Sequence, residues 1–285
     1  MPHSSCFPAK VPRVRSTKKP ARDYQFATSL VHGLDLLRCF TLAEQLLSNA
    51  ELAHRTGLSK ATITRLTYTL TLLGFLRFDT AMRRYRLGSA SITVGYPLLV
   101  SLKVRQVARP LMHALATEMG GTVALGMRDR TQMVYLETCR ARDLVDQLPD
   151  IGASIPMLQT AMGRAWLARA PSEQAATVQQ ALECDTPDIW RRYQAELDAA
   201  RQDMAQFGYC FTRGDFHDGV HAVAVPLGVT VEDELLVFNC CVPGKALASR
   251  ALEEALGRRL LALVAEVRHR LDAETTGMRD APAHH

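Results

Sequence analysis

Residues 48–76 read SNAELAHRTGLSKATITRLTYTLTLLGFL, and their pattern predicts the fold of the first part of the chain. Ser48 is a typical N-cap for a short helix, and Gly57 is suited to the left-handed position that ends it. Ser59 then caps a longer helix that runs to Gly74. Two short helices joined by a glycine-containing turn predict a helix-turn-helix.

The longer helix has an apolar face and a polar face. The apolar stripe, which we expect to be buried, consists of Ile63, Leu66, Leu70 and Leu73. The other face carries side chains that can reach base edges and phosphates of DNA. The candidate DNA-binding residues here are Ser59, Lys60, Thr62, Thr64, Arg65 and Tyr68. Among them Arg65 is suited to a bidentate contact with guanine or to a phosphate clamp.

A small hairpin is predicted directly after this helix. Residues 75–78 (FLRF) and 84–87 (RYRL) alternate around a polar turn, as the strands of a wing would. The wing adds four candidate DNA-binding arginines, Arg77, Arg83, Arg84 and Arg86. Residues 58–88 contain six basic residues and one acidic residue. This excess favours a DNA-binding surface over the alternative of a solvated helix face beside an ordinary hairpin.

The charge of the whole chain is concentrated in its first third. Residues 1–26 hold six Lys or Arg against one acid, and residues 27–88 hold eight against four. Because the formal net charge of the chain is +5, residues 89–285 carry a net charge of −4. The basic part therefore predicts a polyanionic partner for this region alone, although basic tails can also serve solubility.

The remaining sequence predicts an α+β arrangement. An amphipathic helix with Leu30, Leu34, Leu37 and Phe40 at helical spacing precedes the helix-turn-helix. Helical pattern covers residues 91–119. Strands are expected at 122–127, 132–139, about 143–148, about 219–227 and 234–241. Helices are expected at about 160–170, 188–206 and 248–271. Antiparallel strands with segregated helices are typical of the α+β class.

Composition and motifs exclude several functions. The chain has 285 residues, of which 47% are hydrophobic and 22% charged, and it contains neither a long apolar run nor a secretory signal pattern. Its seven cysteines are scattered, so we expect reduced thiols in a cytoplasmic, nucleoid-associated protein with no membrane partner. No motif of a hydrolase, a nucleotide-binding loop or a metalloprotease occurs, so we expect no enzyme activity, no cofactor and no metal. The run Asp215, His217, Asp218 could bind a metal weakly but is more typical of a solvated turn.

A second functional feature is predicted near residue 160. Thr160 is suited to cap a helix, so the backbone N–H groups of Ala161, Met162 and Gly163 would converge at its start. Such a helix terminus favours a carboxylate. The alternative is an ordinary structural cap that holds no ligand.

Five segments together resemble the IclR family of bacterial transcriptional regulators. They are SLVHGLDLLRCF at 29–40, ELAHRTGLSKATITRLTYTLTLLGFL at 51–76, IPMLQTAMGRAWLA at 155–168, GVHAVAVPL at 219–227 and NCCVPG at 239–244. The resemblance covers about residues 25–272. It implies a winged helix-turn-helix, a linker helix and a C-terminal effector domain with a curved antiparallel sheet, assembled as a homodimer or homotetramer. The segment FATSLVHGL is similar to members that control aromatic-acid breakdown.

The resemblance also implies an effector pocket. Its positions in this chain are Leu144, Gln147, Ile155, Ala161, Met162, Thr212, Val220, Ala222, Asn239 and Cys241. Members that bind very small keto acids have an acidic residue at Thr212, a cysteine at Ala222 and hydroxyls at Asn239 and Cys241. We therefore expect a different effector and easier accommodation of a carboxylate. Arg164, Arg213 and His221 lie near these positions, and we expect each to be exposed.

The predicted organisation has five parts. They are a disordered basic tail (1–24), a winged helix-turn-helix (25–88), a linker helix (89–106), an effector-binding and oligomerisation domain (107–272) and a flexible tail (273–285). The expected function is sequence-specific binding of a double-stranded DNA operator, modulated by a small carboxylic or aromatic acid. The alternative is a constitutive DNA-binding regulator whose C-terminal domain only oligomerises.

Overall fold

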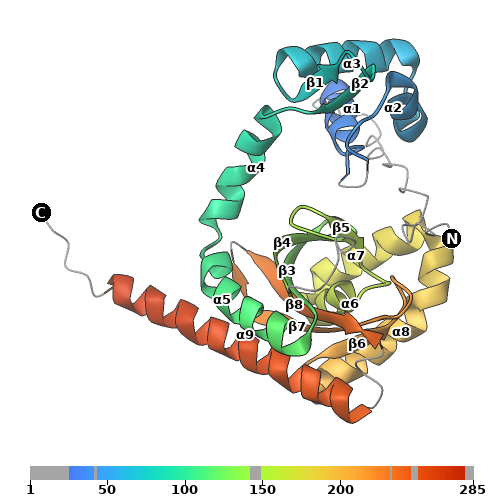
Figure 1. Cartoon of the computed structure of the whole chain (residues 1–285). Helices are drawn as coiled ribbons and strands as arrows, with labels where there is room; N and C mark the ends of the chain where they lie inside the picture. The colour runs from blue at the N-terminus through green and yellow to red at the C-terminus, as the bar shows by residue number, and fades with distance from the viewer. Residues whose placement is uncertain (1–25, 42–43, 142–148, 232, 245–249, 280–285) are drawn as a thin grey trace, which may run out of the picture. The chain divides into compact units, whose positions relative to one another are not determined.

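The computed structural model describes residues 26–41, 44–141, 149–231, 233–244 and 250–279 (Figure 1). The chain divides into two compact units, Met1–Leu98 and Leu99–His285. The boundary falls inside the segment expected to link the two domains. The predicted tail at 1–24 and the expected strand near 143–148 lie outside the described residues.

The first unit is a winged helix-turn-helix, as predicted. Its elements are α1 (Thr28–Leu37), α2 (Asn49–Thr56), α3 (Lys60–Leu72), β1 (Leu76–Asp79) and β2 (Arg84–Leu87). Ser48 caps α2 and Gly57 ends it with a φ of 72°, while the Ser59 hydroxyl accepts the Thr62 N–H at the start of α3. These caps satisfy backbone N–H groups that helix geometry leaves free.

The core of this unit differs from the predicted stripes at two places. In α1 the buried residues include Gly33 and Leu36, whereas Leu30 and Leu34 are 62% and 50% exposed. The helix therefore presents to the core a face one residue away from the predicted one. In α3 the fully buried residues are Ile63 and Thr67. Leu73 is 60% exposed because it is the C-cap residue, beyond the last helical turn.

Two further helices follow the wing. They are α4 (Ala90–Ser101) and α5 (Lys103–Met119), separated at Leu102. None of the residues of α4 is buried, although the helix contains no charged side chain. The expected linker helix spans α4 and the first residues of α5, and within the second unit α5 contributes Val104, Ala108 and Met112 to an apolar core.

The second unit is built on a six-stranded antiparallel sheet, which confirms the predicted α+β class. Its strands are β3 (Thr122–Asp129), β4 (Gln132–Arg140), β5 (Ser154–Pro156), β6 (Cys210–Arg213), β7 (Val220–Val231) and β8 (Glu234–Pro243). Their order in the sheet is β5-β4-β3-β8-β7-β6. Adjacent Cys240 and Cys241 face opposite sides of the sheet, as the alternation of a strand requires.

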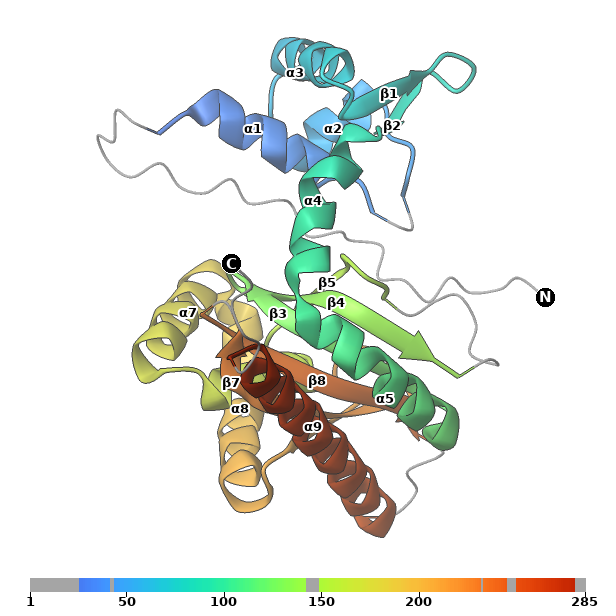
Figure 2. The ribbon, with the colours of Figure 1, turned by 90° about the vertical axis from the view of Figure 1, so that its left-hand side faces the viewer.

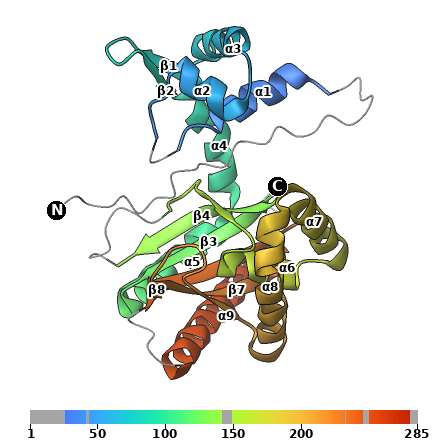
Figure 3. The same ribbon diagram turned by 90° about the vertical axis from the view of Figure 1, so that its right-hand side faces the viewer.

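Helices cover both faces of this sheet. On one face α5 and α9 (Arg250–Arg279) lie side by side (Figure 2). On the other face lie α6 (Ala161–Arg169), α7 (Ser172–Asp185) and α8 (Pro187–Phe207) (Figure 3). Helix α7 was not predicted from the sequence, and α9 runs beyond its predicted end. Each face has its own apolar core, centred on Phe238 on the α5/α9 side and on Trp166 on the α6/α8 side.

A β-bulge in β4 changes which side chains face which core. Leu125 pairs with Glu137 and Gly126 pairs with Tyr135, so Leu136 has no partner on β3. Tyr135 therefore packs with the α6/α8 core, whereas Leu136 packs with the α5/α9 core and the carboxylate of Glu137 contacts α5. Bulges redirect side chains in this way, and here the bulge lies beside the cavity described below.

Candidate DNA interface and ligand pocket

The polar face of α3 is exposed in the first unit. Lys60, Thr64, Arg65 and Tyr68 are all exposed, and Ser59 and Thr62 lie at the helix start, where their hydroxyls are 2.9 Å apart. Among the described residues, no hydrogen bond or ion pair occupies the guanidinium of Arg65. The buried side chains of Ile63 and Thr67 hold the opposite face against α1, α2 and β1. The helix thus has a docked face and a free face that carries cationic and hydroxyl groups, as a recognition helix requires.

The wing brings two arginines together on one face. Arg77 on β1 is directly opposite Arg86 on β2 in the hairpin register, and both side chains are exposed. Like charges in directly opposed positions destabilise a strand pair, and a phosphate between them would relieve the repulsion. Arg83 is also exposed and lies in the hairpin turn with a φ of 51°. These three arginines are available to the DNA backbone.

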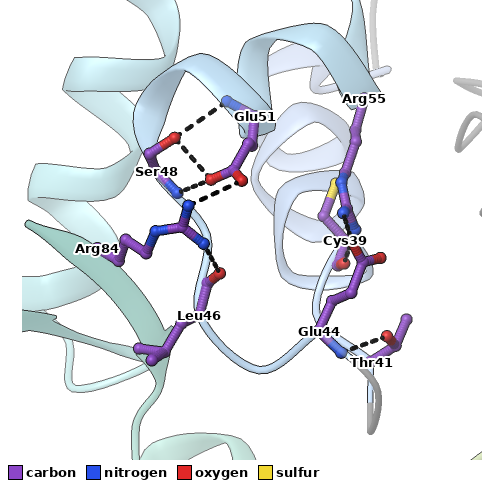
Figure 4. A network of polar contacts seen from close by, with 8 residues as sticks. All are labelled: Cys39, Thr41, Glu44, Leu46, Ser48, Glu51, Arg55 and Arg84. Carbon is purple, nitrogen blue, oxygen red and sulfur yellow. Dashed lines mark hydrogen bonds and ion pairs between the residues drawn. The ribbon is translucent and has the colours of Figure 1, made fainter. Parts of the chain in front are cut away.

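Arg84 has a different role within the unit (Figure 4). Its guanidinium donates to the Leu46 carbonyl at 3.0 Å and forms an ion pair with Glu51 at 3.2 Å. Glu51 also accepts the Ser48 N–H at 2.8 Å, which completes the capping box of α2. These bonds hold the pKa of the Glu51 carboxyl below its usual value, the Ser48 N–H being the largest cause. Arg84 therefore fastens the wing to the start of α2, a function that the spacing of the sequence does not reveal.

The second unit contains a small, partly open cavity of about 40 Å³. Its described lining consists of Thr122, Tyr135, Pro149, Gln159, Thr160, Ala161, Thr212, Phe216, His217, Val220, Ala222, Asn239 and Cys241. One row of the sheet forms part of this wall, because Thr122, Cys241, Ala222 and Thr212 are consecutive partners across β3, β8, β7 and β6. Its size is that of a few water molecules, and its polar lining is what marks it as a candidate ligand site.

Three buried polar atoms of the lining have no hydrogen-bond partner among the described residues. They are the hydroxyl of Thr122, the amide oxygen of Asn239 and Nε2 of His217. Thr122 and Asn239 are 4% and 3% exposed, so water hardly reaches them from outside. The amide nitrogen of Asn239 is engaged with the Tyr135 hydroxyl at 3.4 Å and the Cys241 sulfur at 3.2 Å. Because an unsatisfied buried polar group costs free energy, this arrangement favours a polar ligand.

The start of α6 forms another part of the wall. The Thr160 hydroxyl accepts the Gly163 N–H at 3.2 Å, so the predicted cap is present. By helix geometry the N–H groups of Ala161 and Met162 have no acceptor within the helix. Gly163 must be a glycine, since a Cβ there would lie 2.2 Å from the Met157 backbone. The capped start of α6 thus lies in the wall of the same cavity as the unpartnered atoms.

The structure brings together six of the ten pocket positions that the family resemblance implied. Ala161, Thr212, Val220, Ala222, Asn239 and Cys241 line the cavity. Ile155 and Met162 lie in the α6/α8 core beneath it. Leu144 and Gln147 lie outside the described residues.

Several lining residues were missed from the sequence. Thr122 and Tyr135 come from strands whose register the sequence does not give, although Gln159 and Thr160 directly precede Ala161 and could have been included. The sequence favours a solvated turn for His217, and no local pattern indicates that its ring reaches a cavity. Arg164 is a correction: it is 3% exposed rather than exposed, because its Nε donates to the Leu158 carbonyl at 2.7 Å. Within the part of the chain that the structure describes, no group of three His, Cys, Asp or Glu side chains is placed to hold a metal.

These features define a class of protein. A winged helix-turn-helix with an exposed cationic recognition face is the DNA-reading part of a transcriptional regulator, and the second unit adds a fold with a partly open cavity lined by unpartnered polar atoms. A model of the IclR helix-turn-helix domain matches residues 29–80, and one of the bacterial transcriptional regulator IclR C-terminal domain matches residues 97–233. The chain belongs to the IclR family of DNA-binding transcriptional regulators.

Individual relatives agree with this assignment. The HTH-type transcriptional regulator TsaQ1/TsaQ2 of Comamonas testosteroni is 32% identical over 90% of this chain and 94% of its own length. The crystal structure of an IclR family transcriptional regulator from Brucella abortus is 37% identical, with a TM-score of 0.79 over 93% of this chain and 99% of that one. An IclR homologue from Microbacterium hydrocarbonoxydans, crystallised with 4-hydroxybenzoate, shares the fold at 19% identity, with a TM-score of 0.65 over 85% of this chain and 99% of that one. No helix among the described residues is long and apolar enough to cross a membrane.

Proposed function

We propose that this regulator binds its operator as a homodimer and that a small carboxylic acid, aromatic acids included, modulates this binding. The observation that carries the proposal is the cavity of the second unit. It combines the start of α6, where Ala161 lines the cavity, with the unpartnered Thr122 hydroxyl and Asn239 amide oxygen. A carboxylate suits the helix start, and a second polar group such as a hydroxyl suits the two unpartnered side-chain atoms. The 4-hydroxybenzoate in the Microbacterium homologue is a ligand of this kind.

The exposed apolar surface of α4 supports the homodimer. Ile92, Val94 and Tyr96 are each more than 60% exposed on this uncharged helix. Water-exposed apolar surface of this extent favours pairing with a like surface, and a second copy of the chain provides one. Gly95, whose missing Cβ would meet no atom within 4 Å, would allow two copies of α4 to cross closely. Such a dimer would offer two recognition helices to two half-sites of a pseudo-palindromic operator, within the cytoplasm where that DNA lies.

A chain of contacts leads from the cavity wall to the end of α4. Tyr135 lines the cavity, and beyond the bulge the buried carboxylate of Glu137 forms an ion pair with Arg105 at 2.9 Å. Arg105 also donates to the Leu99 carbonyl, in the last turn of α4, at 2.7 Å. A ligand that shifts β4 would therefore act on the helix that leads to the DNA-binding unit. We propose that effector binding changes operator affinity by shifting the balance between arrangements of the dimer.

Thermal unfolding with a panel of small carboxylic and aromatic acids tests the proposal. We expect one compound or a few to raise the melting temperature by several degrees, since ligand binding to the folded state stabilises it. Asn239→Leu should remove this shift, and Gln180→Leu, the same amide-to-leucine change on the exposed face of α7, should retain it. The active compound should change affinity for a DNA site selected from a random pool by about 5–150-fold. If no acid binds while DNA binding is intact, the chain is a constitutive regulator whose second unit only oligomerises.

A further inference from the structure

The loop between β6 and β7 contributes two residues to the cavity. It covers residues 214–219 and begins and ends at Gly214 and Gly219, both with positive φ. Phe216 and His217 lie between these glycines and line the cavity, and their rings are in contact with centroids 4.2 Å apart. The tight glycine turns allow the loop to fold back over the sheet.

Buried contacts fix the position of this loop. Asp215 forms an ion pair with Arg164 of α6 at 2.8 Å, and its backbone carbonyl accepts the hydroxyl of Tyr193 of α8 at 3.3 Å. The Arg164 guanidinium is itself held by the Leu158 carbonyl and lies over the Tyr193 ring. The loop is therefore fastened to α6, the helix whose first turn forms the cavity wall.

His217 reaches the cavity with an unused hydrogen-bonding atom. Its Nε2 is buried and has no partner among the described residues. Burial lowers the pKa of this imidazole below its usual value, and Asp218 offsets the shift only in part. Without a ligand the ring is consequently neutral near neutral pH.

The other described lining residues carry no fixed charge, and Arg140, whose charge acts on Tyr135, is paired with Asp150. Of the lining residues, Tyr135 and Cys241 are titratable, and burial raises the pKa of both, to about 12 for the Cys241 thiol, so that they remain protonated. Asp218 is exposed beside His217, and the carboxylate of Asp215 is paired with Arg164. The described lining holds no Lys, Arg, Asp or Glu. Among the described lining residues, an anion would thus find no fixed cationic side chain, and His217 supplies an imidazole that can become a cation.

We propose that His217 is the charge partner of the effector and that binding of a carboxylate is coupled to the uptake of one proton by its imidazole. The proton comes from solvent, and the product is an imidazolium beside a carboxylate. This proposal rests on the acid effector proposed above and names the residue that selects for it. It predicts a preference for carboxylates over their neutral amides or esters, because neither of these can stabilise the imidazolium.

The coupling sets the direction of the pH dependence. A neighbouring carboxylate raises the pKa of His217 in the complex above its value in the free protein, so affinity is highest in mild acid and falls as pH rises. Between the two pKa values the association constant should fall by up to about tenfold per pH unit. The pocket would then respond to the acid and to pH together.

Isothermal titration calorimetry of the full chain tests this, with benzoate, 4-hydroxybenzoate and the acids of the panel as probes. Titrations at about pH 6 and about pH 8, in buffers of different ionisation enthalpy, count the protons taken up. We expect uptake of close to one proton per ligand and tighter binding at the lower pH. His217→Gln should bind more weakly at the lower pH and lose both the uptake and the pH dependence. His113→Gln, the same change on the exposed face of α5, should keep them.

The outcomes separate the two proposals. Binding of a carboxylate without proton uptake, or uptake that persists in His217→Gln, overturns the role of His217 and leaves the acid effector in place. Equal affinity of the wild-type protein for a carboxylate and its amide overturns it as well. Failure of every acid to bind overturns the acid effector and His217 with it. Thermal melting of His217→Gln without ligand checks that the variant folds. If it does not fold, the number of protons that the wild-type protein takes up on binding still tests the coupling.

Discussion

The DNA-binding surface and the cavity differ in where their functional residues come from. The surface is drawn from one helix and one hairpin within residues 59–86, and its cationic groups are exposed. The cavity is drawn from strands β3, β4, β6, β7 and β8, the start of α6 and a loop, and its polar groups are buried and uncharged. The surface suits a polyanion whose own charge is strong and extended, whereas the cavity suits a small molecule that must be enclosed and matched atom by atom.

This difference affects how each site tolerates change. A side chain on the surface of α3 can be removed without disturbing the core, so its loss should affect DNA binding alone. The cavity wall is continuous with the α6/α8 core, so many of its changes should affect folding and binding together. The expected effects below are arranged from the largest to the smallest.

Trp166→Ala should give the largest effect, because Trp166 is fully buried at the centre of the α6/α8 core. We expect the free energy of unfolding of the second unit to fall by about 3–5 kcal/mol. Both tryptophans of the chain lie in this unit, so the emission of the remaining Trp190 reports its unfolding in urea. Trp190→Ala, at a half-buried site on α8, should cost clearly less. Equal losses in the two variants would contradict the assigned core.

Arg65→Ala should weaken binding to the selected DNA site without changing stability. Loss of a bidentate base contact corresponds to about 1–3 kcal/mol, or roughly 5–150-fold in affinity. Fluorescence anisotropy with labelled DNA measures the change, and relaxed preference at one base pair would identify a base contact. Arg191→Ala, an exposed arginine of α8, is the matched control and should leave DNA affinity unaltered. Unchanged affinity in Arg65→Ala would remove the main support for α3 as the recognition helix.

Arg86→Ala and Arg84→Ala should separate the two roles of wing arginines. Arg86→Ala should lower DNA affinity severalfold and reduce the slope of log affinity against log salt by about 1, as loss of one phosphate contact does. Arg84→Ala should leave the salt slope close to that of the wild-type protein, because its guanidinium is engaged with Leu46 and Glu51. A salt slope that falls only in Arg84→Ala would reverse the assignment.

Glu51→Gln should give a small, pH-dependent loss of stability around α2. The charged carboxylate stabilises the helix start by roughly 0.3–1 kcal/mol. Since the folded pKa of Glu51 lies below its unfolded value, this stabilisation is present above the unfolded pKa and is lost as pH falls through the folded pKa. Hydrogen exchange of the α2 amides should therefore be faster in Glu51→Gln than in the wild-type protein at neutral pH and similar in acid. A difference that grows in acid would contradict this sign.

The local elements and the candidate DNA-binding surface follow from short-range patterns in the sequence. Caps at Ser48 and Ser59, the glycine after α2 and the helical period of α3 act within a few residues of one another, so their consequences can be derived from spacing. Even there, the face of α1 was misplaced at Leu30 and Leu34, because helical period alone does not tell which of two adjacent apolar stripes meets a core. The start of α6 was predicted for the same local reason.

The rest of the cavity and the contacts of Arg84 with Leu46 and Glu51 depend on long-range packing. The row from Thr122 to Thr212 exists because four strands pair in a particular register, and the bulge at Leu136 turns Tyr135 and Glu137 to opposite faces. Arg84 is drawn to a carbonyl 38 residues away in sequence. His217 lies in the cavity because Asp215 is paired with a buried arginine of another element. Contacts between distant residues depend on the whole arrangement of strands and helices, and no local pattern in the chain encodes them.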